Sequence, residues 1–269
     1  MSARTHAHEA ASAAGNSTAL RVLARAGFAA SGLVHLLLGY IAIRVAFNHG
    51  GESDQSGALA QIAKLPAGVF ILWLTVVGLF ALGLWLIIQA ILGIGSSSKK
   101  RWVRSVVSAG KAVAYIALGV TALSFAMGGS SSSSDSTKEA SSTIISLPGG
   151  PFLLGLVGAV AIGIGGYFIY KGCARKFTED INPPGGKTES AVVALGITGY
   201  VAKGIAVAVV GILFIVAAVT VDPKQASGLD GALKALADLP FGIVILSVVG
   251  LGLIAYGVYT FARARYARL

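Results

Sequence analysis

The sequence predicts an all-α integral membrane protein with six transmembrane helices, arranged as three tandem helix pairs. Three observations predict this fold: long apolar stretches, a repeated helix-pair pattern, and connections that alternate between basic and acidic. Of the 269 residues 55% are hydrophobic and 12% are charged. A membrane-spanning helix needs about 20 predominantly apolar residues, and the chain has six stretches of at least that length. The six apolar stretches are Leu20 to Phe47, Pro66 to Leu92, Val106 to Met127, Pro148 to Tyr170, Ala191 to Val221 and Pro240 to Phe261.

The first helix of each pair repeats without gaps along the chain. Ser31 to Gly39 aligns with Lys111 to Gly119 and with Lys203 to Gly211, and a glycine closes all three segments. Internal similarity at a fixed spacing is the signature of a repeat architecture.

The second helix of each pair opens with a Leu-Pro-x-Gly motif, which begins at Leu65, Leu147 and Leu239. Nineteen residues after each proline the chain has an aromatic residue: Trp85, Tyr167 and Tyr259. At 1.5 Å rise per residue that separation is about 28 Å, close to the hydrocarbon thickness of about 30 Å. We therefore expect the proline and the aromatic residue to mark opposite membrane interfaces.

The repeats divide the chain into a disordered cytoplasmic arm and three two-helix domains. The expected bounds are 1–20 for the arm and 21–92, 104–176 and 191–265 for the domains. An even number of spans gives every copy the same orientation, so the three pairs are predicted to form a pseudo-threefold bundle.

Two of the acidic connections contain short apolar-periodic pieces, at Ala58 to Leu65 and Ala232 to Leu239, which are typical of interfacial helices. The second repeat has no clear counterpart. Its serine-rich segment from Ser130 to Thr137 predicts a flexible linker instead.

Lysine and arginine gather in the N-terminal arm, the second and fourth connections and the C-terminal tail, which lie on one side of a six-span chain. By the positive-inside rule both termini are cytoplasmic in a multi-pass protein of the plasma membrane. The net charge of +10 does not predict nucleic-acid binding, because the basic residues flank spans instead of forming a patch on a soluble domain. We expect anionic lipid headgroups on the cytoplasmic side as partners.

The chain resembles the bacterial membrane proteins catalogued as domain of unknown function 1206. The resemblance runs from about Arg21 to Arg265 and rests on the triplicated helix pair, the Arg25 to Gly32 opening and the Leu-Pro-x-Gly motifs. It implies a three-repeat, six-span protein of the bacterial cytoplasmic membrane, and it implies no particular activity, ligand or cofactor. The second repeat departs most, with Ala112 where its partners have Gly32 and Gly204.

Ser31, Lys111 and Lys203 occupy equivalent positions and are the principal candidates for a ligand or lipid-headgroup site. A charge inside an apolar stretch is costly and marks a functional-site candidate. Both lysines also lie near the predicted inner interface, where a long side chain can extend its ammonium group to the headgroups. Arg44 is a weaker candidate of the same kind near the outer interface.

His35 and Tyr115 occupy one repeat-equivalent position and are weak candidates for the same site. The third repeat has Val207 there, so the triplication does not reproduce a histidine. A lone membrane histidine is more typical of hydrogen-bonded packing than of a metal or haem ligand. We therefore expect no metal and no cofactor, and an inert thiol at Cys173, the single cysteine.

Glycine is frequent, with 36 residues, and recurs at a spacing that keeps it on one helix face. Small residues allow helix backbones to approach closely in membranes. The glycines that we expect to serve helix packing are Gly32, Gly39, Gly119, Gly204 and Gly211.

Two functions from different classes remain open. The first is a non-enzymatic module that binds lipid, a partner membrane protein or a second copy of itself. The second is passage of a small solute or ion along the axis relating the repeats, where repeat-built transporters place their paths. The expected spans contain no carboxylate, which disfavours acid-base chemistry inside the membrane. We expect no enzymatic activity, and the binding module is the favoured interpretation.

Overall fold

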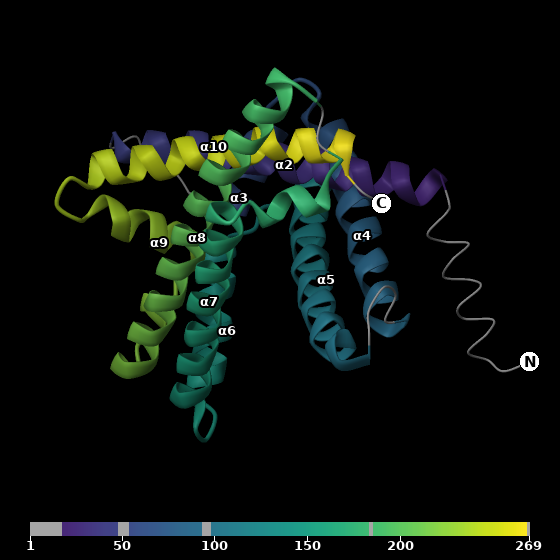
Figure 1. Ribbon diagram of the computed structural model, residues 1–269. Helices are drawn as coiled ribbons and strands as arrows, with labels where there is room; N and C mark the ends of the chain where they lie inside the picture. The colour runs from purple at the N-terminus through teal and green to yellow at the C-terminus, as the bar shows by residue number, and fades with distance from the viewer. Residues whose placement is uncertain (1–17, 48–53, 93–97, 183–184, 268–269) are drawn as a thin grey trace, which may run out of the picture.

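The computed structural model describes residues 18–47, 54–92, 98–182 and 185–267, and most of them are helical (Figure 1). Within these residues six helices are long and apolar enough to cross a membrane, namely α2, α4, α5, α7, α8 and α10. The predicted fold class, an all-α multi-pass membrane protein, is therefore confirmed. The elements in chain order are α2 (Thr18–Ala46), α3 (Gln55–Ala63), α4 (Gly68–Leu92), α5 (Ser98–Ala126), α6 (Ser133–Ile145), α7 (Gly150–Cys173), η1 (Lys176–Asp180), α8 (Lys187–Thr220), η2 (Pro223–Gln225), α9 (Gly228–Ala237) and α10 (Gly242–Tyr266).

Some helices begin earlier than the apolar stretches predict. α5 begins at Ser98 and α8 at Lys187, whereas the stretches were expected from Val106 and Ala191. These extra turns are polar and basic, so hydropathy does not detect them although they continue the helix. The expected arm, 1–20, lies outside the described residues up to position 17, and α2 begins at Thr18.

The Leu-Pro-x-Gly motif forms the same tight turn in all three repeats. The backbone N–H of Gly68 donates to the carbonyl of Leu65 at 2.8 Å, and Gly150 and Gly242 repeat this bond at 2.8 and 2.7 Å. A Cβ at any of these glycines would collide with a carbonyl oxygen of the preceding short helix. Glycine is therefore required where the short helix turns sharply into the span.

The prediction of a flexible serine-rich linker is wrong, because the second repeat has a short helix there, α6, like α3 and α9. The hydroxyl of Ser132 accepts a hydrogen bond from the backbone N–H of Asp135 at 3.2 Å, which caps the helix. α6 buries Ser134 and Ser141, where the other short helices bury leucine or isoleucine. An apolar periodicity could not reveal a helix that packs through serine.

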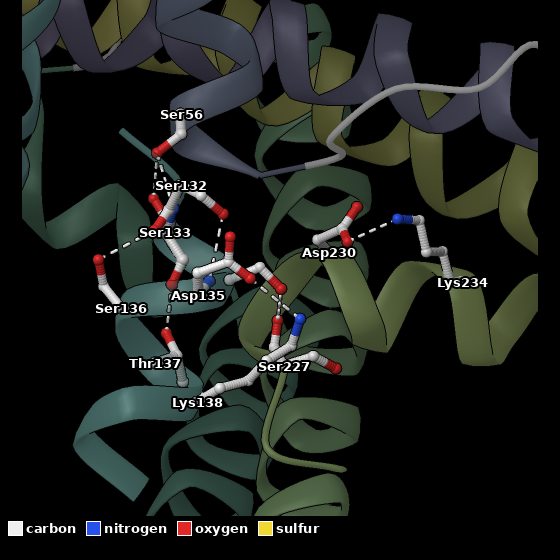
Figure 2. Close-up of polar contacts among 11 residues, drawn as sticks. Ser56, Ser132, Ser133, Asp135, Ser136, Thr137, Lys138, Ser227, Asp230 and Lys234 are labelled. Atoms are coloured by element: carbon white, nitrogen blue, oxygen red, sulfur yellow. Dashed lines mark hydrogen bonds and ion pairs between the residues drawn. The ribbon is translucent and has the colours of Figure 1, made fainter. Parts of the chain in front are cut away.

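The three short helices meet at one end of the molecule through the polar contacts that Figure 2 shows. The hydroxyls of Ser56 and Ser133 are hydrogen-bonded at 2.6 Å, and the Ser134 hydroxyl donates to the carbonyl of Ser227 at 3.0 Å. α6 thereby joins α3 of the first repeat to the N-terminus of α9 in the third. We call this the capped end of the molecule.

The closest pairings of the long helices join different repeats. α4 packs against α5, α7 against α8, and α10 against α2, so that the last helix returns to the first. The pseudo-threefold arrangement expected for three parallel repeats stays a prediction. In Figure 1, α2 and α10 lie side by side, while the α4/α5 pair and the α7/α8 pair extend from them as separate arms.

Glycines line two of these three pairings. A Cβ at Gly158 or Gly165 of α7 would lie 2.6 Å from the carbonyl oxygen of Gly211 or Gly204 of α8. A Cβ on Gly39 or Gly32 of α2 would likewise lie 3.0 Å or less from the carbonyl oxygen of Gly250 or Gly257 of α10. In the α4/α5 pair the glycines face side chains instead: a Cβ on Gly83 would lie 2.8 Å from Cγ1 of Ile116 and 3.6 Å from the carbonyl oxygen of Ala112, and one on Gly119 would lie 3.4 Å from the Phe80 ring.

Helices of the same repeat also contact each other in the first and third repeats, where α2 packs on α4 and α8 on α10. In the second repeat, α5 and α7 have almost no such contact among the described residues. The ring of helices is therefore open at one place.

Candidate anion-binding site at the basic end

The end of the bundle opposite the cap is where α7 and α10 finish and where α8 begins. We call it the basic end, because Lys111, Lys171, Lys203 and Arg263 come together there from four different helices. These four side chains, with Asp180 and Tyr256, make up what we call the basic site.

Lys203 of α8 reaches into the bundle. Its ammonium group donates a hydrogen bond to the hydroxyl of Tyr256 on α10 at 3.3 Å and lies 4.3 Å from the centre of that ring. It also lies 5.4 Å from the centre of the Phe168 ring on α7. A half-buried lysine is thus held by aromatic faces, and cation–π attraction is strongest where water is excluded.

His35 of α2 also lies against Tyr256, and Ser31 lies against His35. The His35 ring centre is 4.7 Å from that of Tyr256, and Nδ1 of His35 donates to the carbonyl oxygen of Ser31 at 2.7 Å. His35 also lies within electrostatic range of Lys203. Three candidates from the sequence, Ser31, His35 and Lys203, are therefore brought together around a tyrosine that sequence reasoning did not select.

Lys171 and Arg263 share one carboxylate. The Lys171 ammonium lies 2.6 Å from Oδ2 of Asp180, and the Arg263 guanidinium lies 3.5 Å from the same oxygen. The three side chains are each between 15% and 29% exposed, so solvent screens this network only in part.

Asp180 is held in place by the folding of η1 against the ends of the helices. Phe177 is fully buried, stacks on Tyr200 with ring centres 5.4 Å apart, and accepts a hydrogen bond from the Tyr259 hydroxyl on its carbonyl at 3.3 Å. Four residues after Phe177, the backbone of Ile181 forms a bridge with Ala267 after α10. A short connection is thereby fixed so that its carboxylate faces two basic helix ends.

Lys111 of α5 stands at the open side of the site. Its side chain is exposed, but Lys171, Arg263, Asp180 and Tyr256 all lie within its electrostatic range. Tyr115, one turn further along α5, is half-buried and lies within range of Tyr256 and Arg263. Lys111 and Tyr115 therefore border the same site.

Arg44 is not part of this site. It lies in the last turn of α2 towards the capped end and lines an open hollow of about 350 Å³ with Tyr40, Ile43 and Phe47. Arg44 lies nine residues, or about two and a half helical turns, after His35 on α2.

Sequence reasoning missed Lys171, Arg263, Asp180 and Tyr256. Two of these were detectable: Lys171 and Arg263 each stand twenty-three residues after the proline of their repeat, and Gln89 is their equivalent in the first. The Gln89 side chain lies outside the described residues. Asp180 and Tyr256 have no such signal, because no repeat reproduces them.

Comparisons with known proteins agree with this architecture. The family model described as Domain of Unknown Function (DUF1206) matches three times, over residues 26–93, 106–175 and 198–267. The chain is also 31% identical over 252 residues to a Bacillus subtilis (strain 168) protein named Uncharacterized protein YxxB, covering 91% of this chain and 90% of that one. No solved structure matches. The three matches fall on the three helix-pair repeats, and the chain belongs to the DUF1206 family.

Proposed function

We propose that this protein is a non-enzymatic membrane module that holds an anionic group, either a lipid headgroup or a free anion, at the basic site. The observation that carries the proposal is the environment of Lys203. It is half-buried, its ammonium group lies against the Tyr256 hydroxyl and the Tyr256 and Phe168 rings, and it forms no ion pair with an acidic side chain among the described residues. A charge removed from water is costly unless it is paired, and a bound anion would pair it.

The charge balance of the site favours the same conclusion. Lys111, Lys171, Lys203 and Arg263 carry four positive charges, and Asp180 offers one negative charge to two of them. The Tyr256 hydroxyl, which receives the Lys203 hydrogen bond, adds a neutral donor. Such a set suits a phosphate-bearing group, which has several oxygens to accept hydrogen bonds.

The expected orientation in the membrane supports an anionic lipid as the ligand. The positive-inside rule assigns the basic end to the cytoplasmic side, where the leaflet is rich in anionic lipids. A basic site at the level of those headgroups meets anionic groups at high local concentration. The proposed function needs no chemical step.

The proposal is tested with purified protein in nanodiscs of neutral lipid, to which phosphatidylglycerol is added. Lys111→Gln with Lys203→Gln should weaken binding about thirtyfold, since each of the two lost charges near anionic lipid removes about 1 kcal/mol. Lys64→Gln, an exposed lysine at the capped end, is the matched control and should change nothing. Equal binding by the double variant and wild type would refute the proposal. Anion flux into proteoliposomes that the double variant abolishes would replace it with a transport function.

A further inference from the structure

The open place in the helix ring, between α5 and α7, has a cause in the sequence. In the first repeat, α2 and α4 meet at Gly27 and Gly78, where a Cβ on Gly27 would lie 3.0 Å from the Gly78 carbonyl. In the third repeat, Gly199 and Gly252 occupy the equivalent positions and lie against Tyr256 and Ala202. The second repeat has valine at both of these positions, Val107 and Val160.

The faces of α5 and α7 that would meet are uncovered. Val160 is 55% exposed, although its equivalents Gly78 and Gly252 are buried. One turn further on, Ile164 is 45% exposed, whereas its equivalents Leu82 and Tyr256 are buried. On α5, Gly110 has nothing within 4 Å of a Cβ position, while its equivalent Ala202 packs on Gly252.

This uncovered face leads to the basic site. Lys111 directly follows Gly110 on α5, and Lys171 stands seven residues after Ile164 on α7, which keeps it on one helix stripe with that residue. The two lysines lie within electrostatic range of each other. An apolar strip between two helices thus ends in a cluster of positive charge.

We propose that an anionic phospholipid occupies this strip, with its acyl chains along Val160 and Ile164 and its phosphate at Lys111, Lys171 and Lys203. The proposal rests on the proposed function and narrows the anion to a membrane lipid that enters sideways between α5 and α7. The strip is apolar along Val160 and Ile164 and ends at basic residues, just as a phospholipid has apolar acyl chains and ends in an anionic phosphate group. A partner helix fits less well, because branched side chains stand where the close helix pairs of this protein have glycine.

The test distinguishes the contribution of the acyl chains to binding from that of the headgroup. Val160→Trp fills the strip, and Ala159→Trp is the matched control, since Ala159 and its equivalents Val77 and Leu251 are all exposed on the outer surface. The two probes are phosphatidylglycerol and its chain-free headgroup, glycerophosphoglycerol. Losing the burial of about two methylene groups lowers an affinity about tenfold. Val160→Trp should therefore weaken phosphatidylglycerol binding about tenfold and leave glycerophosphoglycerol binding unchanged, and Ala159→Trp should change neither.

Each outcome decides one proposal. Equal lipid binding by the two tryptophan variants would overturn the lipid site between α5 and α7. The proposed function would survive this result if Lys203→Gln still weakened the binding of both probes. Insensitivity of both probes to Lys203→Gln would instead overturn the proposed function. A change in the mass of the purified complex caused by Val160→Trp alone would assign the strip to a second copy of the chain and overturn the lipid.

A second measurement needs no blocking substitution. Ile164→Cys, made with Cys173→Ser, carries a fluorophore in the strip, and a brominated phosphatidylglycerol should quench it more strongly than brominated phosphatidylcholine does. The same label at Ala159→Cys should be quenched equally by both lipids. If the two brominated lipids quenched the label equally at Ile164→Cys as well, a site for anionic lipid in the strip would be contradicted.

Discussion

The close pairing of α7 and α8 should depend on single glycines, and Gly165 is the sharpest test. A Cβ there would lie 2.6 Å from the carbonyl oxygen of Gly204 and 2.7 Å from the backbone N of Ala208. Ordinary contacts begin near 3.4 Å, so Gly165→Ala must separate the two backbones locally by about 0.8 Å. Overpacking of this kind costs about 1–3 kcal/mol, and a gap of that size forfeits a quarter to a half of each neighbouring dispersion contact.

Helix propensity acts in the opposite direction and has to be removed from the comparison. Alanine is favoured over glycine inside a helix by about 1 kcal/mol, so Gly165→Ala alone can look nearly neutral. Gly166→Ala is the matched control, because it gains the same propensity and has nothing within 4 Å of the new Cβ. We expect Gly165→Ala to be less stable than Gly166→Ala by about 1–3 kcal/mol.

Pulse proteolysis in mixed micelles at increasing dodecyl sulfate concentration measures this difference as a shift in the midpoint of unfolding. The wild-type protein gives the reference for both variants. Equal midpoints for Gly165→Ala and Gly166→Ala would refute the inference that α7 and α8 are in backbone contact.

Two further predictions concern topology and pH. The native Cys173 should resist an impermeant thiol reagent added to intact cells, whereas Ser136→Cys in a Cys173→Ser chain should react, because the basic end is assigned to the cytoplasm; the reverse pattern would invert the topology. Hydrogen bonds from Lys138 and Ser132 lower the pKa of Asp135 at the start of α6. Because this pKa lies below its unfolded value, the contribution to α6 is present above about pH 4 and is lost as the pH falls through the folded pKa. Hydrogen-exchange protection of the first turn of α6 should therefore fall on acidification, and Asp135→Asn should show no such dependence.

The spans could be predicted from the sequence because their signal is local. Twenty apolar residues and a repeated proline turn define a helix wherever the rest of the chain lies, and α4, α7 and α10 begin two residues after the expected prolines. α6 could not be predicted in this way, since its burial is achieved through Ser134 and Ser141. The hydrogen-bond partners of Ser133 and Ser134 come from other repeats, and periodicity within one segment carries no information about them.

The basic site was only half predictable for a similar reason. Lys111 and Lys203 stand out because each is a charge within an apolar stretch and they share one repeat position. Asp180 enters the site only because Phe177 is buried among aromatic residues from α8 and α10. Phe177 and Tyr259 are 82 positions apart in the chain, and no pattern within one segment predicts their contact.

Divergence among the repeats explains why a three-repeat architecture has a one-sided site. The first repeat supplies neutral residues, Ser31 and Gln89, at the two positions where the others supply Lys111, Lys203, Lys171 and Arg263. Positive charge is therefore absent from one third of the ring at these positions and concentrated where the second and third repeats meet. The second repeat also has valine where glycine closes the other two helix pairs, which leaves α5 and α7 apart on that same charged side. The valines at the glycine positions and the lysine at the serine position are separate features of the second repeat, and both fall beside the open side of the ring. Their coincidence is what a lateral entrance for an anionic lipid requires.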